Sequence, residues 1–107
     1  MHKLIVVFRH PTDPAWFDKH WSEDFVIAAE KMPGIRRVVV SRITGAPAGE
    51  AEIHLIHEFH FDDAAALHRA MTSSEGQAAG RALMRFARQN VSLCFAEHYE
   101  EDRPAAD

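Results

Sequence analysis

The chain has 107 residues, of which 47% are hydrophobic and 26% charged, and its formal net charge at pH 7 is −4. These values are typical of one globular domain, which at this length buries roughly 65% of the surface of its unfolded chain. The negative charge and the lack of a basic run argue against nucleic acid as a partner, because nucleic-acid binding depends on clustered lysine and arginine.

Cys94 is the one cysteine of the sequence. No intrachain disulfide can therefore form, and we expect a reducing, cytoplasmic setting. The apolar run at residues 4–8 is too short for a signal-peptide core or a membrane span, so we expect no membrane partner. We also expect no cofactor and no metal, because the sequence has no phosphate loop, dinucleotide fingerprint or zinc-ligand spacing.

Residues 3–9 are rich in branched apolar side chains and predict a first strand. The segment 13–32 predicts one amphipathic helix: Asp13 suits the N-cap, Pro14 suits the first helical position, and Pro33 with Gly34 ends the run. Side chains at helical spacing predict its buried face, which consists of Phe17, Trp21, Phe25, Ala28 and Met32.

Residues 35–44 predict a second strand, residues 45–49 a turn, and residues 52–61 a third strand. In the third strand Ile53, Leu55, Phe59 and Phe61 alternate with a second set that should face the other way, namely Glu52, His54, Glu58 and His60. Asp62 or Asp63 should cap a helix at residues 64–71, and Ser74 a second one in which Gln77 completes a capping box. Residues 91–99 predict a fourth strand with Cys94 as a small buried residue, and residues 100–107 a frayed tail.

This order of strand, helix, strand, strand, helix, strand predicts a single ferredoxin-like α+β domain over residues 1–99. Its antiparallel four-stranded sheet should carry both helices on one face. The second and fourth strands have apolar residues on both faces, among them Val39 and Ala96, and the chain offers no further element to cover the second face. We therefore expect a homodimer in which two sheets pack face to face, a dimeric α+β barrel.

Several motifs resemble the EthD family of dimeric α+β-barrel proteins: L-I-V-V-F-R, then P-x-x-P-x-x-F-x-x-H-W, then M-P-G-I-R-R-V. Later, H-E-F-H-F-D-D-A-A-A-L and S-S-E-G-Q-A-A-G resemble the family's strand ending in Phe-Asp and its S-x-E-G turn. The resemblance covers roughly residues 3–99. His20 and Trp21 match the family's leading His-Tyr pair, but its second histidine falls on Phe25, which can neither transfer a proton nor bind a metal.

His20 is one candidate catalytic residue. It follows Trp16 by one helical turn, and helix geometry places Asp24 and Glu23 within its reach. An imidazole oriented by a carboxylate in an apolar pocket can act as a general base. The alternative is a boundary histidine that stabilises the helix through Asp24.

His57 is the second candidate, because it falls on the strand face that should meet the helices. A polar group there must find a partner or line a cavity. We expect His20 and His57 to border one pocket walled by Trp16, Trp21, Phe25 and Asp24; the alternative is that His57 is a satisfied core histidine. A metal site is not expected, since on a strand His54 and His60 would lie about 20 Å apart and His57 would point to the opposite face.

Together these features predict an EthD-like homodimer that binds a hydrophobic, oxygenated small molecule. Its activity would be cofactor-independent proton transfer of the isomerase type, or an accessory role in the oxidative catabolism of hydrophobic compounds. The first alternative is a non-catalytic binding or interaction module with structural histidines. Phe25, at the position of the family's second histidine, favours this alternative. The second is a cofactor-independent monooxygenase.

Overall fold

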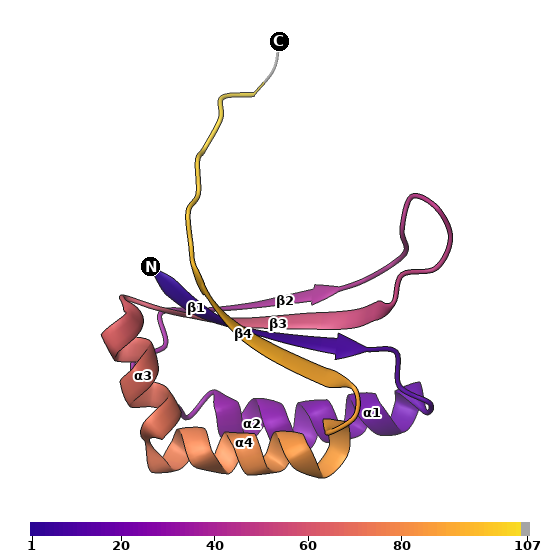
Figure 1. Ribbon diagram of the computed structural model, residues 1–107, viewed down its shortest axis with the longest axis horizontal. Coiled ribbons are helices and arrows are strands. Elements are labelled where there is room, and N and C mark those ends of the chain that lie inside the picture. The colour runs from indigo at the N-terminus through magenta and orange to yellow at the C-terminus, as the bar shows by residue number, and fades with distance from the viewer. Residues whose placement is uncertain (106–107) are drawn as a thin grey trace.

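The computed structural model describes residues 1–105, so the last two residues of the predicted tail at 100–107 lie outside the described residues. Four antiparallel strands form one sheet in the order β2-β3-β1-β4, and the helices cover one of its faces (Figure 1). The strands are β1 (His2–Arg9), β2 (Arg37–Arg42), β3 (Ile53–Phe61) and β4 (Val91–Glu97). The predicted ferredoxin-like α+β fold is confirmed.

Successive residues of each strand point alternately to the helix side of the sheet and to its outer face. Leu4 pairs with Phe59, and Val6 pairs with His57, in the two central strands. Leu4, Val6 and Phe59 are at most 3% exposed because this side of the sheet meets the helices. The intervening residues point to the other face, which no described helix covers.

The predicted first helix is divided into α1 (Pro14–His20), a π-helical turn η1 (Trp21–Phe25) and α2 (Val26–Ala29). Residues four apart drift by about 40° around an α-helix, and the wider π-helical turn offsets that drift. Phe17, Phe25 and Ala29 therefore all lie in the core. Trp21 and Ala28, both expected on the buried face, are only partly buried against this core, whereas Ala29, which the pattern did not include, is fully buried.

Two further helices, α3 (Ala64–Thr72) and α4 (Ser74–Ala87), meet at a tight junction. Asp63, one of the two residues predicted for this position, is the N-cap of α3. The cap of α4 is Ser73 rather than the predicted Ser74, since the Ser73 hydroxyl accepts a hydrogen bond from the Gly76 backbone N–H. Gly76 lies so close to α3 that an added Cβ would fall 2.1 Å from the Ala70 carbonyl oxygen, which makes glycine necessary there.

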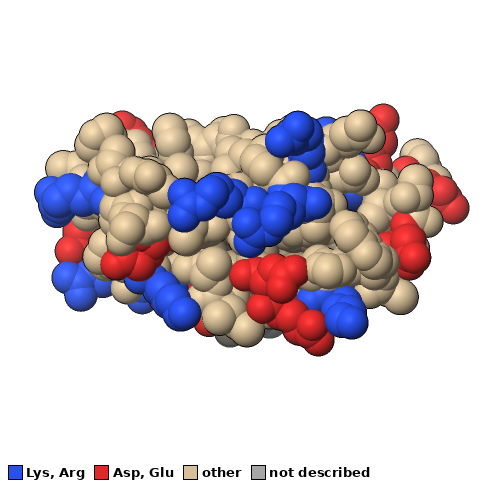
Figure 2. All heavy atoms as spheres, turned by 90° about the horizontal axis from the view of Figure 1, so that it is seen from below, with Lys and Arg blue, Asp and Glu red and all other residues tan. Residues whose placement is uncertain are grey.

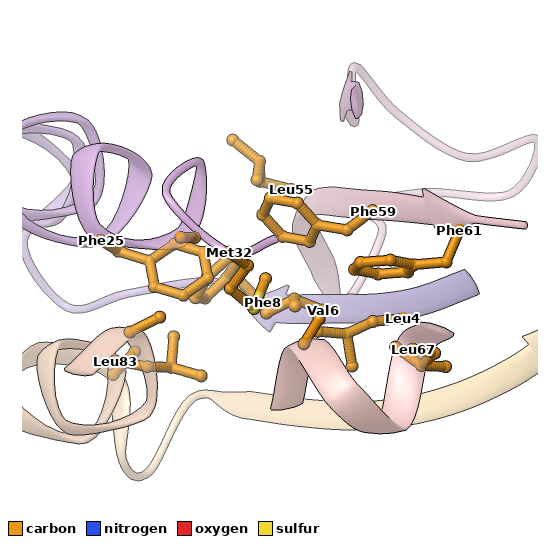
Figure 3. Packing of buried hydrophobic residues seen from close by; sticks show 14 of the residues in the cluster. Leu4, Val6, Phe8, Phe25, Met32, Leu55, Phe59, Phe61, Leu67 and Leu83 are labelled. Carbon is orange, nitrogen blue, oxygen red and sulfur yellow. The ribbon is translucent and has the colours of Figure 1, made fainter. Parts of the chain in front are cut away.

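The core lies between these helices and the central strands (Figure 3). Phe8 lies at its centre, with its ring edge-on to Phe17 at 5.0 Å and to Phe25 at 6.2 Å. Aromatic pairs prefer this T-shaped arrangement, and large buried rings contribute much of a small domain's stabilisation. The aromatic side chains of the first helix thus hold it against the sheet.

An irregularity at the start of β3 changes the position of His54. Phe8 pairs with Leu55 and Arg9 with Ile53, so His54 is the extra residue of a β-bulge. Both residues at a bulge can project to one side, which breaks the alternation. The expectation that His54 lies on the outer face was wrong, because its ring lies 5.3 Å from Phe17 on the helix side.

The outer face of the sheet carries the apolar residues Ile5, Val7, Val39 and Ile56 at its centre, with Glu58 between Ile5 and Val39 in register and paired with Lys3. Cys94 also lies on this face and is exposed in the single chain, so the expectation that it is buried was wrong. His60 lies at one end of the face beside Glu58 and His98, and is only 2% exposed.

On the helix side, Lys and Arg are interspersed with Asp and Glu over the surface (Figure 2). Over residues 1–105, no helix is both long enough and apolar enough to cross a membrane.

Candidate functional site

The candidate site lies where η1 crosses the centre of the sheet. The Trp21 indole N–H donates a hydrogen bond of 3.2 Å to His57 Nδ1. His57 is fully buried in the interior strand β3, where Val6 of β1 and Val40 of β2 are its neighbours. A helix residue and a strand residue that are 36 positions apart in sequence are thereby joined.

Aromatic rings surround the His57 imidazole. It stacks on Phe59 at 4.3 Å between ring centroids, and Phe25 meets it edge-on at 5.7 Å. These apolar walls exclude water, and burial disfavours the charged form of histidine. Burial accordingly lowers the pKa of His57 from 6.5 to about 4. The residue is therefore neutral at physiological pH.

The Trp21 hydrogen bond also decides which nitrogen of His57 carries the proton. A neutral imidazole has one N–H donor and one acceptor nitrogen, and the indole can only donate. Nδ1 is thus the acceptor, and Nε2 carries the hydrogen. His57 Nε2 is buried and has no hydrogen-bond partner, so it offers a neutral N–H donor among aromatic walls.

His20 lies at the end of α1 with a carboxylate partner. Its Nδ1 is 2.7 Å from Asp24 Oδ2, and its ring lies 4.4 Å from that of Trp16. About a third of the His20 side chain is exposed, as is nearly half of Asp24. The pair has the geometry of a carboxylate-oriented imidazole, with Nε2 left for a second partner.

None of the five hollows described on the surface is lined by both His20 and His57. The largest of these five, of about 680 Å³, lies beside α4 and is lined by Arg81, Arg85, Arg88 and apolar neighbours such as Leu93. His20 and His57 line neither this hollow nor the four smaller ones described with it. The two histidines are connected through Trp21 instead, because Trp21 follows His20 in the chain and contacts His57.

Two charged residues near this site were missed by the sequence reasoning. Asp18 of α1 lies 3.6 Å from both Arg42 Nη1 and His54 Nε2, and the Arg42 guanidinium lies 5.5 Å from the Trp21 ring centroid. Because an unbroken alternation places His54 on the outer face, the sequence pattern could not bring it to Asp18. Within residues 1–105, no three His, Cys, Asp or Glu side chains are arranged to hold a metal ion.

Fold and site together define a ferredoxin-like α+β protein in which a partly buried tryptophan of the first helical segment donates a hydrogen bond to a fully buried histidine of the sheet. No family model matches the chain. The chain is, however, 36% identical to an EthD family protein from Bacillus halodurans; the match covers 92% of this chain and 99% of that one, with a TM-score of 0.90. The chain belongs to the EthD family.

Two other similarities extend this comparison. The chain is 27% identical over 97 residues to an uncharacterized 11.0 kDa protein in the thcB-thcC intergenic region of Rhodococcus erythropolis, covering 91% of this chain and 94% of that protein. It is 20% identical to a dimeric protein of unknown function with a ferredoxin-like fold from Bacteroides fragilis, with a TM-score of 0.62 over 91% of this chain and 95% of that one. The second similarity shows the fold alone.

The lowered pKa of His57 predicts a pH-dependent stability. The unfolded chain takes up a proton near pH 6.5, whereas the folded chain does so only near pH 4. The stabilisation linked to neutral His57 is therefore fully present above the unfolded pKa. As the pH falls from about 6.5 to about 4, this residue lowers the free energy of unfolding by roughly 3 kcal/mol. Urea unfolding at several pH values should show this loss in the wild type.

Two variants form the matched comparison. In His57→Phe, the part of the pH dependence of the unfolding free energy that is due to His57 should disappear. His68→Asn changes an exposed histidine and should keep that pH dependence. Carboxylates that titrate in the same range are common to all three proteins and cancel in the difference. An equal slope in His57→Phe and the wild type would contradict the assignment.

Proposed function

We propose that the protein is a homodimeric EthD protein that binds a hydrophobic, oxygen-bearing small molecule between its first helix and its sheet. The observation that carries the proposal is the partnerless Nε2–H of His57 among Phe25, Phe59 and Trp21. A buried donor without an acceptor is costly, and a ligand oxygen would satisfy it. A cytoplasmic setting is part of the proposal, because Cys94 has no intrachain partner for a disulfide.

The chemistry that this arrangement supports is proton transfer next to a carbonyl group. His20, oriented by Asp24, takes a proton from the carbon beside the carbonyl and returns it to a different carbon. His57 donates its Nε2–H to the oxygen, on which negative charge develops in the enolate. A neutral donor fixed by Trp21 suits this role, since it stabilises the oxyanion without becoming a base itself. The proton balance closes within the protein and the substrate.

A non-catalytic binding module is the second candidate. It is favoured by the absence of His20 and His57 from the linings of the described hollows, and by Phe25 at the position of the family's second histidine. In that case His57 would be a structural core histidine, and His20 and Asp24 would only stabilise the helix. The two candidates differ in whether His20 matters for a reaction.

The proposed dimer places two sheets face to face. The apolar residues at the centre of the outer face, Ile5, Val7, Val39 and Ile56, have no cover within residues 1–105, and the one carboxylate between them, Glu58, is paired with Lys3. Burying such a surface stabilises association in proportion to its apolar area. A second copy of the chain supplies an identical apolar face, as a two-fold axis requires.

Solvent-deuterium exchange tests the proposed chemistry. We expect the wild type to accelerate exchange of the acidic protons in at least one of three cyclic carbonyl compounds: 2-tetralone, 2-indanone and α-angelica lactone. His20→Gln and His57→Phe should each lower that rate roughly 100-fold or more, because positioned acid–base groups contribute on that order. The readout is the loss of proton NMR signal in heavy water, with His68→Asn as the unaffected control.

The outcomes separate the two candidates. A wild-type rate equal to that of buffer for all three compounds would contradict proton transfer and leave the binding module in its place. Exchange that depends on His57 but is unchanged in His20→Gln would assign the base to another residue.

Sedimentation equilibrium at micromolar concentration tests the dimer. We expect a mass of twice 12.1 kDa for the wild type. Ile56→Glu places a charge in the apolar centre of the outer face and should yield monomers. The matched control, Ile27→Glu, changes an exposed residue on the helix side and should remain dimeric. A monomeric wild type, or a dimeric Ile56→Glu protein, would show that this face is not the interface.

A further inference from the structure

A second group of polar side chains meets at the end of the sheet nearest α1. Asp18 comes from α1, Arg42 from the last position of β2, and His54 from the bulge in β3. Asp18 Oδ1 lies 3.6 Å from Arg42 Nη1 and 3.6 Å from His54 Nε2. We call these three residues the bulge cluster. Its members come from three separate elements and converge on one carboxylate oxygen.

The bulge creates this cluster. With unbroken alternation His54 would face outward, away from Asp18. Bulges are frequent next to functional sites, where they redirect a side chain. Phe17 fixes the redirected ring edge-on at 5.3 Å, and only 17% of the His54 side chain remains exposed. His54 is therefore held in place rather than left free in solvent.

Two atoms of the cluster are buried without a hydrogen-bond partner: Asp18 Oδ1 and His54 Nε2. Their separation of 3.6 Å is longer than a hydrogen bond. Buried polar atoms are nearly always satisfied, so each unsatisfied pair needs an explanation. The missing group must donate to a carboxylate oxygen and accept from an imidazole or guanidinium N–H. A hydroxyl has both capacities on one atom.

Room for the rest of such a molecule lies in a hollow that is lined by His10, a neighbour of the cluster, and not by Asp18, Arg42 or His54 themselves. The His10 ring lies 5.6 Å from that of His54, and His10 also lines a hollow of about 340 Å³ with Ile43, Thr44 and Ala51. That volume is within the range of small-molecule pockets. His10 is itself fixed, because its Nε2 lies 2.6 Å from the Ala51 carbonyl oxygen.

We propose that the bulge cluster binds the weakly acidic hydroxyl of an enol or phenol whose body occupies the hollow beside His10. The hydroxyl donates to Asp18 Oδ1 and accepts from Arg42 or His54. The inference rests on the proposed small-molecule function and names the substrate class for it. Arg42 links the two sites, since its guanidinium lies over Trp21, the residue that holds His57.

Phenol and anisole form the matched probe pair, because anisole keeps the ring and the oxygen but has no hydroxyl proton. We expect phenol to bind the wild type about tenfold more tightly than anisole, as a hydrogen bond to a charged group would provide. Titrations of ¹⁵N-labelled protein should shift the amide signals of Asp18, Arg42 and His54. The preference for phenol should fall to within about twofold in Asp18→Ala and in His54→Phe.

Lys19→Ala is the control on the same helix and should keep the full preference. Asp18 is 43% exposed on α1 and alanine favours helices, so Asp18→Ala tests the site even where His54→Phe disturbs the fold. Equal affinity for the two probes, no phenol binding at millimolar concentration, or an intact preference in Asp18→Ala would each overturn the site.

These outcomes are separate from those of the proposed function. A protein that catalyses deuterium exchange but shows no preference for phenol would lose the hydroxyl site and keep the proposed chemistry. A protein that prefers phenol through Asp18 but catalyses no exchange would keep the site and lose the chemistry.

Discussion

The hydrogen bond from the Trp21 indole N–H to His57 Nδ1 ties the first helix to the middle of the sheet and determines the chemical character of the site. Without it, His57 would be a buried imidazole of undefined tautomer. With it, the acceptor nitrogen is occupied and the remaining nitrogen can only donate. The aromatic walls then keep the ring neutral, because they lower its pKa to about 4. His57, which the sequence indicates only as the second candidate residue, becomes a fixed donor.

Two local irregularities bring the polar groups to this region. The π-helical turn η1 keeps Phe17, Phe25 and Ala29 on one buried face, and leaves Trp21 at the boundary where its N–H reaches His57. The bulge in β3 turns His54 toward Asp18. Phe25, which the sequence resemblance aligns with a histidine of the EthD motif, lies edge-on to His57. In this chain it supplies an apolar wall to the His57 ring.

The fold could be predicted from the sequence because its signals are local and periodic. Asp13 with Pro14 marks the start of the first helix, and alternation in residues 55–61 gives the correct faces of β3. The errors have specific causes. An amphipathic pattern with an α-helical period assigned Ala28 rather than Ala29 to the core, because a π-helical turn has no sequence signature of its own. His54 was placed on the wrong face because a bulge depends on pairing with β1, which is 45 or more residues distant in sequence. Asp18 and Arg42 were missed for the same reason, since they meet only in three dimensions.

Long-range ¹H–¹⁵N correlation of the imidazole reports which nitrogen of His57 carries the hydrogen. At neutral pH we expect a hydrogen on Nε2, an unprotonated Nδ1, and a Trp21 indole proton that exchanges slowly with solvent. In Trp21→Phe the hydrogen should no longer be confined to Nε2. A hydrogen on Nδ1 of the wild type, or an imidazole carrying both hydrogens at neutral pH, would show that Trp21 does not fix His57 as a neutral Nε2–H donor.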